Sequence, residues 1–293
     1  MQGKFSNADR AQVLTQALPY IQKHRGKIVV IKYGGNAMIN EQLKEQVMED
    51  IVLLNLIGVQ VVLVHGGGPE MNDLMNRLGK KPEFIDGLRV TDKETIDIAQ
   101  MVLAGKINKS LVSLLGSKGG TAIGLSGIDG HILQAKIKDE KLGYVGEITG
   151  VNIEPIKDIL ERGYIPVVST IAGDSEGNVY NINGDTAAAH IAGALEAERL
   201  IMVTDIQGVL RDKDDETTLI PELTVKEAKK LYDEGIISGG MIPKVDCCIH
   251  ALNLGVRKVI IMDGRVPHSI LMELLTDEGA GTMFLEDNKD PWD

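Results

Sequence analysis

The chain has 293 residues, of which 42 are acidic and 31 are basic, so its formal net charge at pH 7 is −11. This length is enough to bury a large core without disulfides, as one large domain or two lobes. The acidic balance disfavours a surface built to neutralise nucleic acid or anionic lipid. We therefore expect no nucleic-acid partner and no membrane partner.

The cysteines and the first residues predict where the protein works. Cys247 and Cys248 are adjacent, so a disulfide between them could not cross-link the fold. Two buried thiols are typical of a protein in a reducing compartment. Residues 1–10 lack the apolar core of a signal peptide, and no apolar run reaches the roughly 18 residues of a membrane span. The expected location is the cytoplasm.

Residues 9–24 are predicted to form a separate N-terminal helix. Apolar side chains recur there at helical spacing, at Val13, Leu14, Ala17, Leu18 and Ile21. Pro19 is expected to kink or break this helix. The apolar stripe packs either on its own domain or against another subunit, and the residues leave both possibilities open.

The rest of the chain alternates short apolar runs with helical patterns, which is typical of parallel βαβ units. Strands are predicted at 27–35, 59–69, 121–127, 163–171, 199–205 and 257–264. Helices are predicted at 41–57, 70–78, 92–115, 154–161, 186–196, 225–233 and 244–254. The other predicted segments are an antiparallel hairpin at 130–152, a solvated turn at 212–216 and a frayed terminus at 286–293. The expected fold is α/β, with an open, mostly parallel sheet between helices.

Glycines follow two predicted strands, at the edge where parallel sheets bind their ligands. Gly34 and Gly35 end one strand, and residues 66–68 are three further glycines at the end of the next. Without Cβ atoms in the way, their N–H groups can approach an anion. Lys32 is expected to point toward such an anion, because burying an unpaired ammonium group is costly. Together these residues predict a polyanionic ligand.

The common motifs of other enzyme classes do not occur in the sequence. It has no G-x-x-x-x-G-K-[ST] and no G-x-G-x-x-G, which disfavours a Walker-type loop and a dinucleotide fold. It also has no H-E-x-x-H, C-x-x-C or G-x-S-x-G, which disfavours a zinc hydrolase and a serine hydrolase. His65 is expected to be structural, since no metal-ligand partners are spaced nearby.

Several other polar residues admit two interpretations. Lys244, at the start of a predicted helix, is either simply exposed or functional, and Arg89 either lies on the surface or grips a carboxylate. Asp185 either caps the following helix or holds lysine ammonium groups in place. Residues 204–208 follow a strand and either face a nucleotide or make a turn.

Seven motifs, in this order along the chain, resemble the amino acid kinase family: KYGGNAM, LVHGGGPEMN, GLRVTD, LAGKINK, YNINGDTAAA, VTDIQGVL and SGGMIPKV. The resemblance covers about residues 25–285. It implies the amino acid kinase fold for residues 25–293, with an acid-binding N-lobe at about 25–172 and an ATP-binding C-lobe at about 173–293. Residues 1–24 would then be an N-terminal oligomerisation helix.

The resemblance also implies a reaction. This is the ATP-dependent phosphorylation of the γ-carboxylate of N-acetyl-L-glutamate, the second step of arginine biosynthesis. Mg²⁺ would be held by the ATP phosphates, with no metal ligands from the protein. By the same resemblance, Lys32 and Lys244 stabilise the transferring phosphoryl group, and Asp185 organises both lysines.

Matched residue by residue, the resemblance assigns two binding sites. The residues that would hold N-acetyl-L-glutamate are Gly67, Gly68, Arg89 and Asn181, with Arg89 pairing with the α-carboxylate. The residues that would hold ATP are Gly34, Gly35, Thr204, Asp205, Gly208, Ile236, Ile237 and Ser238.

The N-terminal helix also has a counterpart in this family. Arginine-inhibited members carry such an extension, which interlaces dimers into a hexameric ring. The resemblance therefore implies a homohexamer inhibited by L-arginine. The inhibitor would bind near Arg199, His268, Glu273 and Gly281.

Three other functions compete with this interpretation. Within the same fold, the chain could phosphorylate a related acid, such as an aminoadipate derivative, carbamate or glutamate. A non-catalytic arginine or nucleotide sensor is a second alternative, although a sensor would not need Lys32, Asp185 and Lys244 together. A dehydrogenase is the third, and the missing dinucleotide motif argues against it.

Overall fold

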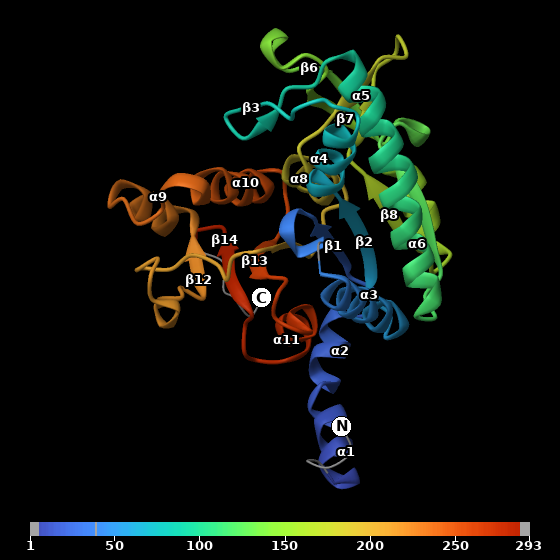
Figure 1. Cartoon of the computed structure of the whole chain (residues 1–293). Helices are drawn as coiled ribbons and strands as arrows, with labels where there is room; N and C mark the ends of the chain where they lie inside the picture. The colour runs from blue at the N-terminus through green and yellow to red at the C-terminus, as the bar shows by residue number, and fades with distance from the viewer. Residues whose placement is uncertain (1–5, 39, 288–293) are drawn as a thin grey trace.

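An eight-stranded sheet forms the centre of the computed structural model, which describes residues 6–38 and 40–287 (Figure 1). Its strands, in spatial order, are β12 (Glu222–Thr224), β14 (Gly281–Leu285), β13 (Lys258–Asp263), β11 (Arg199–Thr204), β1 (Ile28–Tyr33), β2 (Gln60–His65), β8 (Ile165–Ser169) and β5 (Ala122–Ser126). The strands from β13 to β5 are parallel, β14 is antiparallel to β13, and β12 runs parallel to β14. The predicted mostly parallel α/β sheet is confirmed.

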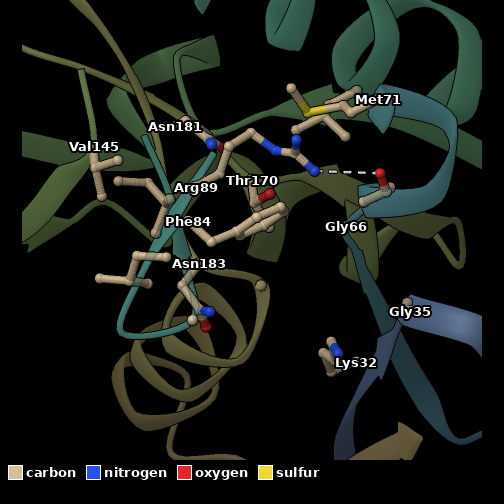
Figure 2. Close-up of a pocket in the computed structure, with 18 residues that line it drawn as sticks. Lys32, Gly35, Gly66, Met71, Phe84, Arg89, Val145, Thr170, Asn181 and Asn183 are labelled. Carbon is tan, nitrogen blue, oxygen red and sulfur yellow. Dashed lines mark hydrogen bonds between the residues drawn. The ribbon is translucent and has the colours of Figure 1, made fainter. Parts of the chain in front are cut away.

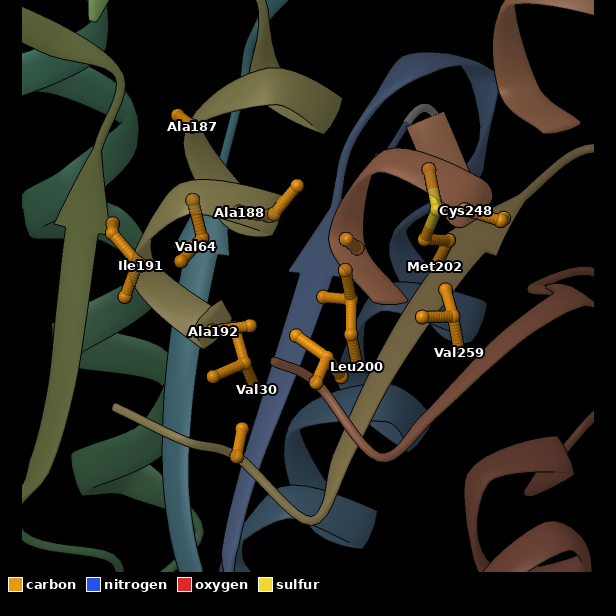
Figure 3. Packing of buried hydrophobic residues seen from close by; sticks show 14 of the residues in the cluster. Val30, Val64, Ala187, Ala188, Ile191, Ala192, Leu200, Met202, Cys248 and Val259 are labelled. Atoms are coloured by element: carbon orange, nitrogen blue, oxygen red, sulfur yellow. Dashed lines mark hydrogen bonds between the residues drawn. The ribbon is translucent and has the colours of Figure 1, made fainter. Parts of the chain in front are cut away.

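Helices cover both faces of this sheet, because successive residues of a strand point to opposite sides. One face packs α7 (Glu154–Glu161), α8 (Gly184–Ala194), α9 (Val225–Asp233) and α10 (Ile242–Asn253). The other packs α3 (Glu41–Leu56), α4 (Gly68–Arg77), α5 (Lys93–Ala99), α6 (Asn108–Ser117) and α11 (Ser269–Leu275). Val30 of β1 belongs to the α8 face (Figure 3), and Val29 and Ile31 belong to the α3 face. The same alternation assigns Lys32 to the α8 face.

The long helix predicted at 92–115 forms, but its hydrogen bonding is not uniform. Residues Gln100–Ile107, between α5 and α6, make an eight-residue π-helical segment, η2. Such segments are uncommon and often mark functional sites. Here η2 delivers Leu103 to the cavity described below.

The hairpin predicted within 130–152 is confirmed as β6 (Leu133–Ile137) paired with β7 (Gly146–Val151). It joins β9 (Ile171–Gly173) and β10 (Val179–Asn181) in a four-stranded sheet, and β3 (Phe84–Ile85) and β4 (Leu88–Arg89) form a separate hairpin. The predicted turn at 212–216 is exposed and irregular. The terminus predicted to fray, 286–293, lies outside the described residues beyond Asp287.

Several elements were not predicted from the sequence. The strands β3, β4, β10, β12 and β14 and the helix α11 are short, so a periodic pattern has little room to develop in them. The remaining short helices are η1 (Gly35–Met38), η3 (Asp129–His131), η4 (Glu140–Leu142), η5 (Glu216–Thr218) and η6 (Gly239–Met241). None of the helices in the described part of the chain is long and apolar enough to cross a membrane.

The N-terminal helix predicted at 9–24 is two helices, α1 (Asn7–Gln16) and α2 (Leu18–His24). Pro19 lies in the first turn of α2, as expected for a residue that interrupts a helix. In Figure 1 the two helices extend away from the sheet as a rod. No residue of α1 is buried, and Val13 and Leu14 are 58% and 73% exposed. Within a single chain, the apolar stripe therefore stays largely uncovered.

Close packing of α8 on α10 yields a stability prediction. A Cβ atom on Gly193 of α8 would lie 2.5 Å from the Cβ atom of Leu254. Gly193→Ala should therefore lower the free energy of unfolding by about 1–3 kcal/mol through overpacking, although alanine favours a helix more than glycine does. In the control Gly116→Ala, the new Cβ on α6 has no neighbour within 4 Å, and stability should rise by up to about 1 kcal/mol. Urea unfolding measures the free energy of unfolding of both variants. An equal change in the two variants would contradict the close approach of α8 and α10.

Candidate active site

A cavity opens at the carboxyl ends of β1 and β2, beside the β3–β4 hairpin (Figure 2). It gathers eight of the residues singled out from the sequence. They are Lys32, Gly34, Gly35, Gly66, Gly67, Gly68, Arg89 and Asn181. Four segments far apart in sequence supply them, since parallel strands end at the same edge of the sheet. The four residues expected to hold the acid thus lie together with the first lysine.

Lys32 and Asp185 form an ion pair at the floor of this region. Lys32 Nζ lies 2.8 Å from Asp185 Oδ1, and the two side chains are 11% and 20% exposed. Asp185 is the second residue of α8, while Asn183 caps that helix by accepting hydrogen bonds from the N–H groups of Asp185 and Thr186. The interpretation of Asp185 as the helix cap is therefore wrong, and its carboxylate instead faces a lysine.

Two lysines set the protonation state of Asp185. Burial by itself raises the pKa of this carboxyl group, but Lys32 and Lys244 outweigh burial, so that its net pKa lies below the usual range. Lys244 lies in the first turn of α10, directly after Pro243. The N-terminal turns of α8 and α10 thus hold an ionised carboxylate that pairs with Lys32 and feels the charge of Lys244.

The glycines around the cavity have different neighbours. A Cβ atom on Gly67 would overlap the side chain of Ile107 and lie 2.7 Å from Leu103, both from η2. Around Gly66 and Gly68, a Cβ atom would meet nothing within 4 Å. A side chain at Gly67 would therefore have to displace the ends of Ile107 and Leu103, while the flanking glycines face open space.

His65 supports this glycine turn from within the sheet. Its side chain is fully buried, with Nδ1 2.9 Å from the carbonyl of Gly66 and Nε2 3.1 Å from the amide nitrogen of Asn108. Burial lowers the pKa of His65 to about 4, so the ring is neutral at pH 7. A neutral ring donates from Nδ1 to Gly66 and accepts at Nε2 from Asn108. The structural role expected for His65 agrees with these contacts.

Arg89 lies at the opposite end of the cavity from Lys32 (Figure 2). Its guanidinium donates to the carbonyl of Gly68 at 3.3 Å and contacts Met75 Sδ at 3.4 Å. The ring of Phe84 lies 4.7 Å away, at a distance typical of cation–π contact. These three contacts involve uncharged groups, so the positive charge remains available to an anion. Neither Met75 nor Phe84 carried a signal in the sequence, because their role depends on where the hairpin folds back.

The other residues expected to bind ATP lie outside this cavity. Thr204 ends β11, the neighbour of β1, and its hydroxyl accepts from the N–H of Ile206. Gly208 has φ +148°, and a Cβ atom there would lie 2.5 Å from Thr282 Oγ1. Asp205 follows Thr204 in the same turn, and the segment Ile236, Ile237 and Ser238 connects α9 to η6, with Ile237 buried. Of these residues, Thr204 and Asp205 lie where β11 ends, at the same edge of the sheet as the carboxyl end of β1.

A second cavity lies between α2 and the C-terminal strands. Three of the four residues expected to bind arginine line it, namely Arg199, Glu273 and Gly281. Arg199 and Glu273 form a buried ion pair of 2.9 Å. The fourth, His268, lines a neighbouring groove instead, with Nδ1 2.6 Å from Asp50 Oδ1.

The two cysteines lie in and beside the core. Cys248 is buried in the core and Cys247 is half-buried on α10, where burial raises the pKa of Cys247 to about 12. Both thiols are protonated at neutral pH. Within residues 6–38 and 40–287, no three His, Cys, Asp or Glu side chains gather as they would around a metal ion.

The buried neutral ring of His65 predicts a pH dependence of stability. Its pKa is 6.5 in the unfolded chain and about 4 in the folded one, so between these values the unfolded state binds more protons and stability falls as the pH falls. Between about pH 7 and about pH 5, His65 should account for a loss of about 2 kcal/mol in the free energy of unfolding. In His65→Gln this share of the loss should disappear. An unchanged pH slope in urea unfolding would contradict the assignment.

Comparison with known proteins agrees with this geometry. The chain matches the amino acid kinase family over residues 27–263. It is 57% identical over 283 residues to an acetylglutamate kinase of Clostridium beijerinckii, which covers 96% of this chain and 99% of that protein. It is 51% identical over 281 residues to an acetylglutamate kinase of a Nostoc species, in an alignment that covers 96% of this chain and 95% of that protein.

Solved structures show the same architecture. An N-acetylglutamate synthase from Neisseria gonorrhoeae, complexed with coenzyme A and N-acetyl-glutamate, has a TM-score of 0.84 at 27% identity, over 95% of this chain and 64% of that one. A carbamate kinase from Giardia lamblia bound to AMP-PNP shares the fold, with a TM-score of 0.65 at 19% identity, over 89% and 99%. Because the family match spans most of the sequence and the kinase relatives align over nearly their full length, the chain belongs to the amino acid kinase family.

Proposed function

We propose that this chain transfers the γ-phosphoryl group of ATP to the γ-carboxylate of N-acetyl-L-glutamate, giving N-acetyl-L-glutamyl 5-phosphate. One observation carries the proposal. A single cavity holds a guanidinium at one end, Arg89, whose contacts described above are all with uncharged groups, and an ammonium at the other, Lys32, with glycine turns between them (Figure 2). An acidic amino acid derivative has two carboxylates, one to anchor and one to react. The full-length similarity to acetylglutamate kinases supports the same substrate.

Electrostatics explains why the site needs several cations. The attacking carboxylate and the γ-phosphate are both anions, and two unit charges about 4 Å apart repel by about 4 kcal/mol at an effective dielectric near 20. Lys32 and Lys244 offset this repulsion, and Asp185 keeps both lysines oriented. No general base is required, because a carboxylate is already ionised at pH 7.

Each substrate has its own part of the site in this proposal. Arg89 pairs with the α-carboxylate, while Asn181 and the N–H groups of Gly67 and Gly68 hold the rest of the acid. Gly34 and Gly35 leave room for the ATP phosphates, whose bound Mg²⁺ supplies further neutralising charge. The remainder of the nucleotide would lie against the residues that follow β11 and α9. The acid-binding and ATP-binding lobes expected at 25–172 and 173–293 stay part of this proposal, as does the cytoplasmic location.

A coupled assay of ADP release tests the function. The chain should turn over N-acetyl-L-glutamate with a higher kcat/KM than glutamate, carbamate or an aminoadipate derivative. A higher value for one of the other acids would assign the chain to that substrate. ADP release with none of them would favour a non-catalytic sensor.

The position of Lys244 predicts a defect in rate rather than in binding. Lys244→Ala should lower kcat by about 100-fold or more, with a much smaller change in either KM, because its contact with the phosphoryl group strengthens in the transition state. Lys229→Ala, an exposed lysine on α9, is the matched control and should leave kcat unchanged. Steady-state kinetics that show only a KM defect in Lys244→Ala would rule out its proposed role.

The second cavity supports a regulatory part of the proposal. We infer that L-arginine, the end product of the pathway that would use this reaction, inhibits the enzyme from the cavity beside α2. Glu222 and Asp277 supply negative charge there for a guanidinium, beside Glu273, which is already paired with Arg199. A related synthase from Neisseria gonorrhoeae has been solved with coenzyme A and L-arginine, with a TM-score of 0.78 at 26% identity. The exposed apolar stripe of α1 would join dimers into a homohexamer.

Removing α1 separates this part of the proposal from catalysis. Deletion of residues 1–16 leaves α2 and the second cavity in place, since α1 has no buried residue. By light scattering, the truncated chain should form a smaller assembly, with the mass of a dimer and not of a hexamer. Arginine should inhibit it more weakly, and kcat should be preserved. Glu273→Gln should weaken inhibition without a change in mass. A truncated chain with unchanged mass and inhibition would contradict the proposed role of α1.

A further inference from the structure

Two histidines meet on the helix pair α8 and α10, outside both cavities described above. His190 lies on α8 and His250 on α10, and their Nε2 atoms are 3.3 Å apart. The ring centroids are 5.2 Å apart, with 55° between the ring planes. His250 is exposed and His190 is half-buried, so solvent reaches the pair from one side. The proposed phosphoryl transfer uses neither residue.

We propose that His190 and His250 form a two-ligand site for a divalent transition-metal ion such as Ni²⁺ or Zn²⁺, with water completing the coordination shell. Two neighbouring ligands of an ion with metal–nitrogen bonds of about 2.0–2.1 Å lie about 2.8–3.0 Å apart at the 90° angles of Ni²⁺ and about 3.3–3.4 Å apart in tetrahedral Zn²⁺. The two Nε2 atoms are 3.3 Å apart, so they match tetrahedral Zn²⁺ as they stand and need to approach by only a few tenths of an ångström for Ni²⁺. Imidazole nitrogen is a preferred ligand for zinc, copper and nickel.

The proton balance of binding is simple at neutral pH. Without metal, the Nε2–H group of one neutral ring donates to the Nε2 lone pair of the other. To bind metal, the donating ring shifts its proton to Nδ1, so both Nε2 lone pairs face the ion and no net proton is released. Burial and the neighbouring ring lower the pKa of His190, which keeps this ring neutral.

The backbone holds the two rings in place before any metal arrives. Gly193 of α8 packs directly against Leu254 at the end of α10, so the two helices are in close contact. Ala188, Ile191 and Cys248 pack in the same core beneath the helices (Figure 3). A preorganised pair loses little conformational entropy on binding, which favours affinity even with two protein ligands.

A bound ion would also connect this site to the active site, and this consequence rests on the proposed function. Asp185 lies in the first turn of α8 and Lys244 in the first turn of α10, five and six residues before the two histidines. A metal bridge between His190 and His250 would hold these two turns at one separation.

Calorimetric titration of the full chain with NiCl2, without nucleotide, tests the site. We expect one Ni²⁺ ion per chain with micromolar affinity and a higher Tm in the presence of Ni²⁺. His250→Ala and His190→Ala should each weaken binding by about tenfold or more. His131→Asn removes an exposed histidine elsewhere, and asparagine tolerates the positive φ of 58° at that position, so this control should bind as the parent does.

Two results would overturn the proposal. The first is no heat of binding at millimolar Ni²⁺ with the parent chain, which would leave a simple hydrogen bond between the rings. The second is an unchanged affinity in His250→Ala, whose exposed position on a helix should let the variant fold. Neither readout uses phosphoryl transfer, so failure of this site and failure of the proposed function are distinguishable.

Discussion

The ion pair between Lys32 and Asp185 is the constraint on which the rest of the site depends. An ammonium group at the end of a buried strand needs a counter-charge, because an unpaired charge there is costly. The partner comes from the first turn of α8, which lies on the same face of the sheet as the Lys32 side chain. Removing either partner would leave the other charge largely buried. The pair therefore ties the start of α8 to the end of β1 and gives the cavity floor its polarity.

Two further features follow from that position. Once α8 lies across β1, α10 packs against it, and the first turn of α10 brings Lys244 near Asp185. The same sheet edge places the glycine turns of β1 and β2 beside the pair, and His65 holds the second turn from below. The result is a cationic pocket in a chain with a net charge of −11. The acidic total concerns the surface as a whole, whereas the site depends on local charge.

The two N-terminal helices contribute to two different surfaces. The α2 helix lines the cavity of Arg199 and Glu273, while α1 carries uncovered apolar residues beyond it. The cavity therefore lies next to the helix through which we propose that subunits associate. His268 lies at the start of α11, bonded to buried Asp50 of α3, and so joins the C-terminal region to the other half of the sheet.

The class of fold and most of the cavity could be predicted from the amino-acid sequence alone. Apolar runs that end in glycine predicted β1 and β2, and ordered motifs predicted Lys32, Arg89, Asn181 and their neighbours, which the structure brings together. These features are local, since a strand, a glycine turn or a helix start depends on a few adjacent residues. The folded structure was needed to show that Asn183, not Asp185, caps α8, and that Phe84 and Met75 contact the Arg89 guanidinium. It alone placed His190 beside His250 and His268 beside Asp50. The physical reason is distance along the chain, because which side chains meet across separate helices is set by packing of the whole core and leaves no periodic trace in the sequence.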